Sequence, residues 1–257
     1  AIDTVRTLIT ALPSNNLSGA PVTDMFGENT GAALTCSASA ADVIAAVADD
    51  NSFIELQKGF GCAAVTGLAQ ASGTTVGVVA YQDEIDADAC SKAARFVRFC
   101  DAFAIPVVSV VNATRFASVR EAAKLSNAYS EATCAKVTVI TGSAYGAVYI
   151  AVAGRGANAD VTMAWPCAVV SPLAPETGAM FAWNEKLAGS ENPVEDRKKL
   201  IEEYAKTECT PFKAAADGFI EDVIDPSETR AKVIAALDML VGKRVSRLPK
   251  KHANIQL

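Results

Sequence analysis

The segment VTVITGSAYGAVY, residues 137–149, decides the fold of this 257-residue chain. It begins with a β-branched run typical of a buried strand, passes through the small residues Thr141, Gly142 and Ser143, and continues as a helix from about Gly146. The first N–H groups of such a helix lack intrahelical partners and can stabilise an anion. Small residues also occur at such turns only because helix and strand must approach closely. The motif by itself leaves both interpretations open.

Short apolar strands and helices alternate on either side of this segment. The expected strands cover residues 53–56, 63–69, 75–81, 106–111, 137–141 and 161–165, with a further apolar run at 219–224. The expected helices cover residues 39–48, 87–103, 118–133, 177–187, 193–206 and 227–240. The strands at 63–69 and 75–81 meet around Ala71-Ser72-Gly73, which predicts a hairpin. Continuous apolar strands between helices indicate an α/β fold with both faces of the sheet covered.

The first 38 residues have a different character from the rest. Residues 4–12 predict a short helix that Pro13 ends, and residues 14–35 are rich in Asn, Gly, Pro and Ser, as in an extended arm. Ser39 can then cap a helix whose first turn holds Asp42, a favourable place for a negative charge. We therefore expect an N-terminal helix and arm over 1–38 and one packed domain over 39–257.

Composition excludes several classes of function. The net charge is −6, the opposite of what a protein that binds nucleic-acid phosphates needs, so no nucleic-acid partner is expected. His252 is the single histidine, which leaves too little imidazole for a Ser-His or Cys-His hydrolase or for a zinc site, and no metal is expected. The uncharged windows at 59–82 and 137–154 contain glycines or a turn, so neither predicts a membrane helix.

The cysteine pattern indicates free thiols. The chain has seven cysteines, an odd number, and none forms a C-x-x-C pair. Their scatter through apolar stretches is typical of small buried residues in a reducing compartment. We therefore expect unpaired cysteines in a cytoplasmic protein.

Two other patterns have ordinary interpretations. The stripe Phe96, Phe99 and Phe103 repeats at helical spacing and predicts a core-facing helix side. The basic cluster at Lys243, Arg244, Arg247, Lys250 and Lys251 either contacts an anionic ligand or partner or forms a solvated tail.

Several longer motifs carry a resemblance to a known family. They are LPSNNL at 12–17, DNSFIELQ at 50–57, KAARFVRFCDAF at 92–103, EAT at 131–133, KVTVI at 136–140, AWP at 164–166, VIDP at 223–226 and PKKH at 249–252. In this order they resemble the C-terminal, biotin-side half of the carboxyltransferase β subunit of acyl-CoA carboxylases and the related methylmalonyl-CoA decarboxylase α subunit. The resemblance covers nearly the whole chain.

The resemblance implies a crotonase-like ββα spiral and catalysis by backbone amides rather than by a side-chain nucleophile. It implies that the amides of Ala147 and Val148 form an oxyanion hole for the ureido oxygen of biotin, with Gly146 allowing close approach. Tyr145, Ile150 and Asn112 are then expected to line the biotin site. Biotin itself is expected on a partner carrier protein.

The resemblance also implies partners, because the family's active site forms between the N half of one subunit and the C half of another. A separate acyl-CoA-binding subunit, acyl-CoA and an oligomeric assembly are therefore expected. The chain would be the biotin-side half of a split carboxyltransferase or decarboxylase. The alternatives are a catalytically degenerate scaffold subunit of such a complex and a stand-alone crotonase-like enzyme that binds acyl-CoA.

The scaffold alternative arises from departures from the family pattern. Where relatives carry a glycine-rich loop that helps enclose biotin, this chain has VNATRFA at 111–117 and is about ten residues shorter. The family's Gly-Gly-Ala becomes Gly146-Ala147-Val148, and Ile150 replaces a residue that is polar in many members. Loss of the loop is expected to open or reshape the pocket, whereas Ala147 and Val148 are expected to crowd the approach to the amides.

Overall fold

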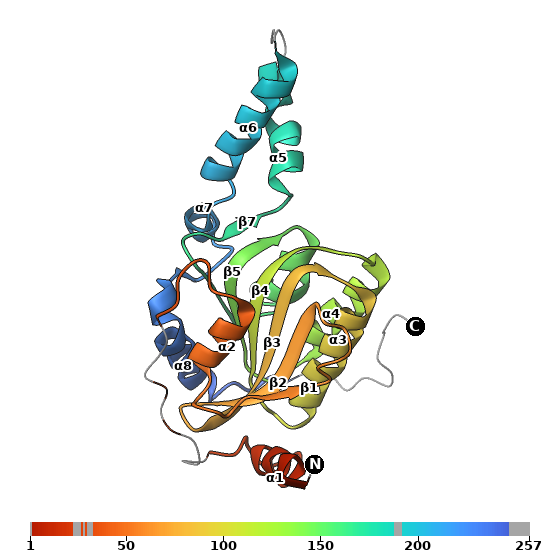
Figure 1. The fold of residues 1–257 in the computed structure, drawn as a ribbon, viewed down its shortest axis with the longest axis vertical. Helices are drawn as coiled ribbons and strands as arrows, with labels where there is room; N and C mark the ends of the chain where they lie inside the picture. The colour runs from red at the N-terminus through yellow and green to blue at the C-terminus, as the bar shows by residue number, and fades with distance from the viewer. Residues whose placement is uncertain (1, 23–26, 28, 30–32, 188–191, 247–257) are drawn as a thin grey trace.

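The computed structural model describes residues 2–22, 27, 29, 33–187 and 192–246. Within them, the chain forms an eight-stranded sheet with the order β1-β2-β3-β4-β5-β6-β8, and β7 pairs with β5 beside this path (Figure 1). The strands are β1 (Ile54–Leu56), β2 (Ala64–Ala71), β3 (Thr74–Ile85), β4 (Val107–Phe116), β5 (Lys136–Tyr145), β6 (Val161–Ala164), β7 (Val169–Ser171) and β8 (Asp222–Val223). The mixed α/β architecture expected from the sequence is confirmed.

The sheet begins antiparallel and continues parallel. β2 and β3 form the expected hairpin, with Ala71 opposite Thr74. From β3 onward each pairing is parallel, through β4, β5, β6 and β8. The carboxyl ends of β4 and β5 therefore lie at the same edge of the sheet.

Two helical layers cover the two faces of the sheet (Figure 1). On one face lie α3 (Ala87–Ala102) and α4 (Val119–Glu131), and on the other lie α2 (Ala40–Val47) and α8 (Thr229–Leu240). Side chains along β3 alternate between the two cores: Val79 and Tyr81 pack on the α3 side, whereas Val78 and Ala80 pack on the α2 side. This period of two explains why strands covered on both faces read as unbroken apolar runs.

The helix cap expected at Ser39 is confirmed, and α3 has a further cap that was not among those expected from the sequence. Ser39 and Asp42 form a capping box at the start of α2. Asp86 caps α3 by accepting a hydrogen bond from the amide of Ala89. The predicted core face of α3 is also confirmed, since Phe96 is buried and Phe99 and Phe103 pack partly buried against the same core.

The remaining helices include one near the N-terminus and several that follow β5. They are α1 (Ile2–Ala11), the π-helix η1 (Tyr149–Ala153), α5 (Pro175–Trp183), η2 (Asn184–Leu187), α6 (Pro193–Thr207), α7 (Pro211–Ala216) and η3 (Pro226–Glu228). Helices α5 and α6 form a hairpin that projects from the body of the molecule (Figure 1). The sequence predicted both of these helices but missed α7 and β7.

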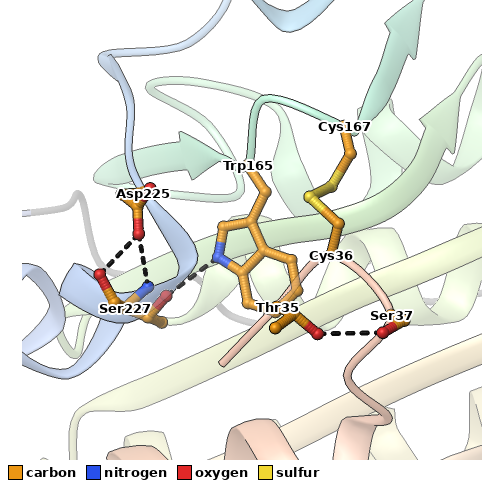
Figure 2. Close-up of a disulfide and its surroundings, with 8 residues drawn as sticks. Thr35, Cys36, Ser37, Trp165, Cys167, Asp225 and Ser227 are labelled. Atoms are coloured by element: carbon orange, nitrogen blue, oxygen red, sulfur yellow. Dashed lines mark hydrogen bonds between the residues drawn. A yellow bond between two sulfur atoms is a disulfide. The ribbon is translucent and has the colours of Figure 1, made fainter. Parts of the chain in front are cut away.

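The expectation that all seven cysteines are free is wrong. Cys36, which precedes α2, forms a disulfide with Cys167 in the loop between β6 and β7 (Figure 2). The other five are free thiols, with Cys62 exposed and Cys90, Cys100, Cys134 and Cys209 buried. The pairing joins positions 131 residues apart, which local spacing does not reveal.

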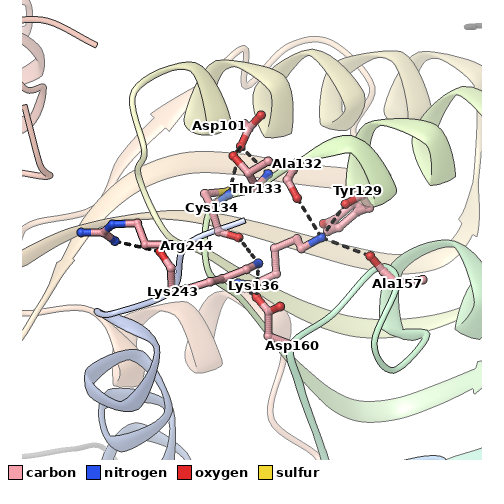
Figure 3. Close-up of polar contacts among 10 residues, drawn as sticks. All are labelled: Asp101, Tyr129, Ala132, Thr133, Cys134, Lys136, Ala157, Asp160, Lys243 and Arg244. Atoms are coloured by element: carbon pink, nitrogen blue, oxygen red, sulfur yellow. Dashed lines mark hydrogen bonds and ion pairs between the residues drawn. The ribbon is translucent and has the colours of Figure 1, made fainter. Parts of the chain in front are cut away.

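Lys136 and Lys243 hold the amino end of β5 through hydrogen bonds and an ion pair (Figure 3). The Nζ atom of buried Lys136 donates to the carbonyl oxygens of Tyr129, Ala132 and Ala157. Lys243 pairs with Asp160 at 2.8 Å, and Asp160 also accepts the amide of Lys136. Lys243 therefore has a structural partner, whereas Arg247, Lys250, Lys251 and His252 lie outside the described residues.

No helix among the described residues is long and apolar enough to cross a membrane.

Candidate functional site

The candidate site lies where β5 ends and the next helix begins. Gly146 follows the last residue of β5 and has a φ of +56°, a left-handed conformation that favours glycine. Its amide donates to the carbonyl oxygen of Ser171 in β7 at 3.1 Å. β7 thus continues beside the end of β5, with Ser143, Ala144 and Tyr145 opposite Val169, Val170 and Ser171. Pairing with β7 therefore fixes the position of the end of β5.

The turn at Gly146 leaves two amides without partners. Among the hydrogen bonds of the described residues, none is donated by the N–H of Ala147 or of Val148, whereas the amide of Ile150 bonds to Gly146 at 3.2 Å. The Val148 side chain is fully buried in the core, and Ala147 is exposed. Burial of Val148 fixes the backbone, so these N–H groups have a defined position.

Asn112 on β4 forms a hydrogen bond to the end of β5, next to the turn at Gly146. We call the turn from Gly146 to Val148 the amide corner. The register between β4 and β5 shifts after Val111, because Ala113 pairs with Ala144 rather than with a residue two positions past Ile140. Asn112 fills this bulge: its Oδ1 atom accepts the amide of Ser143 at 2.9 Å. A Cβ atom on Gly142 would lie only 2.1 Å from that oxygen, so the close approach requires glycine there.

Two tyrosines flank the turn. Tyr145 is half-buried, and its pKa is raised by burial and by the nearby Glu176 carboxylate, so its phenol stays neutral near pH 7. Tyr149 donates its hydroxyl hydrogen bond to the carbonyl oxygen of Phe219 at 2.5 Å and packs edge-to-face on that ring. Tyr149 was not among the residues expected from the sequence, although it lies within the same motif.

The six predicted site residues fall on adjacent strands and one turn. Asn112 lies on β4, Tyr145 ends β5, and Gly146, Ala147, Val148 and Ile150 lie in the turn and first helical residues after it. The Ile150 side chain is 65% exposed. The structure therefore brings these residues to one edge of the sheet, the edge where open α/β sheets bind ligands.

The region expected to be a shortened loop is instead a strand. β4 continues through Phe116, with Arg115 opposite Glu84 and Phe116 opposite Ile85 on β3. Arg115 and Glu84 also form an ion pair at 2.5 Å. The expectation that the strand ends at Val111 is wrong, because cross-strand pairing with β3 extends it.

The amide corner is exposed to solvent at Ala147. One cavity of about 660 Å³ lies near the amino ends of β4 and β5, lined by residues such as Pro106, Ala135 and Lys243. A second, of about 630 Å³, lies between α5 and α6. Neither is lined by Gly146, Ala147 or Val148. A ligand at the amides would need a further surface to enclose it.

Comparison with known proteins gives one consistent family. The model of the carboxyl transferase domain matches residues 1–255. The chain is 37% identical over its whole length to the propionyl-CoA carboxylase carboxyltransferase subunit of Haloferax mediterranei, of which it covers 54%. It is 34% identical, also over its whole length, to the methylmalonyl-CoA decarboxylase subunit alpha of Propionigenium modestum, of which it covers 54%.

A solved structure agrees. Transcarboxylase 12S, crystallised as a hexamer assembly with methylmalonyl-coenzyme A and methylmalonic acid bound, superposes with a TM-score of 0.89 and 33% identity. The match covers 99% of this chain and 53% of that one. The chain thus spans about half the length of the curated relatives it matches.

Proposed function

This chain belongs to the carboxyl transferase domain family, and on that premise we propose that it is the biotin-side half of a split biotin-dependent acyl-CoA carboxyltransferase or decarboxylase. Its fold is crotonase-like, as the resemblance implied. The partner in this proposal is a separate subunit that binds acyl-CoA. A biotin carrier protein brings the carboxyl group that is exchanged between biotin and the acyl-CoA.

The observation that carries this proposal is the pair of unpartnered amides at Ala147 and Val148. Two fixed N–H donors at a helix start suit an oxygen that gains negative charge as a reaction proceeds. The ureido oxygen of biotin is such an oxygen. Because Ala147 is exposed, the donors are reachable by a group that enters from a second protein.

The neighbouring residues support a ring-shaped guest. The amide nitrogen of Asn112 has no hydrogen-bond partner among the described residues, since only its Oδ1 is used. The neutral phenol of Tyr145 can donate as well as accept. Ile150, which follows these amides in the chain, has an exposed apolar side chain. Together they provide polar contacts and an apolar wall for biotin, with no side-chain nucleophile.

The open corner favours a shared site. Ala147 is exposed, and neither of the two cavities described above is lined by Ala147 or Val148, yet charge stabilisation is strongest where water is excluded. We expect the acyl-CoA-binding subunit to cover this corner in an oligomer. That arrangement would bring its bound acyl-CoA next to the biotin site of this chain.

The test removes one amide without unfolding the helix. In Ala147→Pro the backbone N–H disappears, and proline is tolerated in the first turn of a helix. Reconstituted with the co-purifying acyl-CoA-binding subunit and carboxybiotin carrier, this variant is expected to lose about 100-fold or more in the rate of carboxyl transfer. Ala147→Ser, which keeps the N–H, serves as the matched control and should retain most of the rate.

Two results would overturn the proposal. One is a Pro variant that transfers carboxyl groups as fast as the Ser control. The other is the lack of acyl-CoA-dependent exchange with any subunit that co-purifies with the wild-type chain.

The scaffold alternative rests on the continuation of β4. The pairing of Arg115 and Phe116 with β3 occupies the place where the family's loop would leave the sheet. Grafting a family-type loop between Asn112 and Phe116 distinguishes the two functions. Transfer that appears only after grafting identifies the native chain as a scaffold.

A further inference from the structure

A surface disulfide is linked to the candidate site through one short strand. Cys36 and Cys167 are both exposed residues, so a reductant can approach the disulfide from solvent. Exposed disulfides are more often the labile ones, whereas buried disulfides resist exchange. The Cys36–Cys167 bond is therefore more accessible to a reductant than a buried structural disulfide is.

One end of the disulfide is anchored. Cys36 lies in a tight turn in which the amide of Ala38 bonds to Thr35 at 2.9 Å and the hydroxyls of Thr35 and Ser37 are 2.9 Å apart (Figure 2). Leu34 before it is buried, and the capping box at Ser39 follows it. The turn is thus fixed to α2, which packs on the sheet.

The other end leads to the candidate site. Cys167 sits in a turn that follows buried Trp165, and the amide of Ala168 bonds back to Trp165 at 3.0 Å. Only three residues separate Cys167 from Ser171, whose carbonyl oxygen accepts the Gly146 amide. A tether at Cys167 therefore restrains the strand that holds the left-handed turn at Gly146.

β7 has few other restraints. It is three residues long and lies off the main path of the sheet. Apart from its pairing with β5, its backbone makes two hydrogen bonds to other described residues: the carbonyl oxygen of Ser171 accepts the Gly146 amide at 3.1 Å, and the amide of Val170 donates to the carbonyl oxygen of Cys209 at 3.0 Å. Short segments with few hydrogen bonds open locally at low cost, so loss of the tether has a large relative effect here.

We propose that the Cys36–Cys167 disulfide is a redox-controlled tether that holds β7 against β5 and thereby keeps the amides of Ala147 and Val148 in place. Its effect on catalysis rests on the proposed function, whereas its effect on the corner does not. Cys36 and Cys167 are positioning residues in this arrangement. Reduction loosens the corner and lowers the transfer rate.

The chemical step is thiol–disulfide exchange with a dithiol reductant. A thiolate of the reductant attacks one of the two sulfur atoms, the bond between Cys36 and Cys167 breaks, and the other sulfur leaves as a thiolate. The second thiol of the reductant then displaces the first cysteine from the mixed disulfide. Two electrons pass to the protein, the reductant becomes a disulfide, and both cysteines are protonated.

The first measurement needs neither partner nor activity. The full chain, purified without reductant, is alkylated and its free thiols counted by mass spectrometry: five are expected before treatment with dithiothreitol and seven after it. Hydrogen exchange is then followed at residues 143–150. We expect about tenfold faster exchange there after reduction, with residues 76–81 of β3 unchanged.

Variants separate the tether from general effects of the reductant. Cys36→Ser and Cys167→Ser are expected to show the fast exchange without reductant and no further change with it. Cys62→Ser removes the exposed free thiol and should behave as wild type. Equal exchange in oxidised and reduced protein, or seven free thiols before reduction, would overturn the proposal.

The second measurement adds the acyl-CoA-binding subunit and the carrier. Reduction is expected to lower kcat several-fold with the KM for acyl-CoA unchanged, because this chain's corner does not bind the acyl-CoA. Equal kcat in both redox states would refute control by the tether while leaving the proposed function intact. If no transfer occurs in either state, the proposed function fails and the exchange data alone decide whether the tether exists.

Discussion

The Oδ1 atom of Asn112 lies 2.9 Å from the amide nitrogen of Ser143 and accepts its hydrogen bond. This bond crosses the bulge between β4 and β5 at the edge where the candidate site lies. It replaces a backbone ladder bond that the shifted register cannot form. The end of β5, and with it the turn at Gly146, is therefore set partly by a side chain from the neighbouring strand.

Gly142→Ala should be destabilising because its new Cβ atom would lie 2.1 Å from Asn112 Oδ1. We expect a loss of about 1–3 kcal/mol in the free energy of unfolding, measured by urea denaturation. Asn112→Ala alone should cost less, because Asn112 is exposed and water can bind the freed Ser143 amide. The double variant should recover most of the loss, and a strictly additive double variant would show that the clash lies elsewhere.

The central part of the fold could be predicted from sequence because its signals are local. The β-branched run before Gly142, the hairpin turn at Ser72 and the helix cap at Ser39 each act over a few residues. The turn and the cap appear as expected, whereas the strand expected at 137–141 continues past Gly142 to Tyr145. The candidate site followed from a resemblance and from the strand–turn–helix order around Gly146. Its chemical role remains a prediction.

The features that the sequence did not predict depend on partners that are distant in the chain. β4 extends to Phe116 because β3 offers a pairing edge as far as Ile85, which no window around residue 112 reveals. β7 is three residues long, and it is a strand only because it meets the end of β5. The Cys36–Cys167 pair likewise depends on how the arm before α2 lies on the folded sheet.

The ion pair between Asp49 and Arg230 predicts a dependence of stability on acid pH. Burial by itself raises the pKa of Asp49, but hydrogen bonds from Arg230 and from the amides of Gly73 and Ser72 outweigh it and hold the pKa below its ordinary value of 3.8. Because the folded-state pKa is depressed, this stabilisation is present above about pH 4. It is lost as the pH falls through the folded-state pKa.

Asp49→Asn should therefore cost about 3 kcal/mol at pH 7, because it leaves the nearly buried Arg230 without its charged partner. The difference from wild type should shrink as the pH falls below 3.8. Urea unfolding at pH 7, 5 and 3 measures it. Asp3→Asn, at an almost fully exposed carboxylate, is the control and should show no such trend; a constant difference for Asp49→Asn would contradict the prediction.

The buried hydroxyl chain of Tyr81, Tyr129 and Ser109 predicts a dependence on alkaline pH. The Tyr129 hydroxyl lies 3.0 Å from that of Tyr81 and 2.7 Å from that of Ser109. Burial raises the pKa of Tyr129 to about 12. Since the folded state then holds the proton more tightly than the unfolded state, stability is full below pH 10 and is lost as the pH rises toward 12.

Tyr129→Phe should lower the free energy of unfolding by about 1–3 kcal/mol at pH 7, because it leaves two buried hydroxyls with a missing partner. Its decline in stability above pH 10 should be shallower than that of wild type. Adding Ser109→Ala removes one of the two stranded hydroxyls and should cost less than the sum of the single changes. A double variant that is fully additive would argue that water already enters this part of the core.

Replacement of Ile150 tests the proposed assembly with little effect on the stability of this chain. The side chain is 65% exposed beside the amides of Ala147 and Val148, so replacing it with serine should change the free energy of unfolding by less than about 0.5 kcal/mol. If the acyl-CoA-binding subunit covers this corner, Ile150→Ser loses apolar contact area there, and association with that subunit should weaken about tenfold. Val194→Ser, at a similarly exposed position on the α6 hairpin, is the matched control. Calorimetric titration of the two chains measures both variants, and weakening by Val194→Ser alone would place the contact on the projecting hairpin instead of the amide corner.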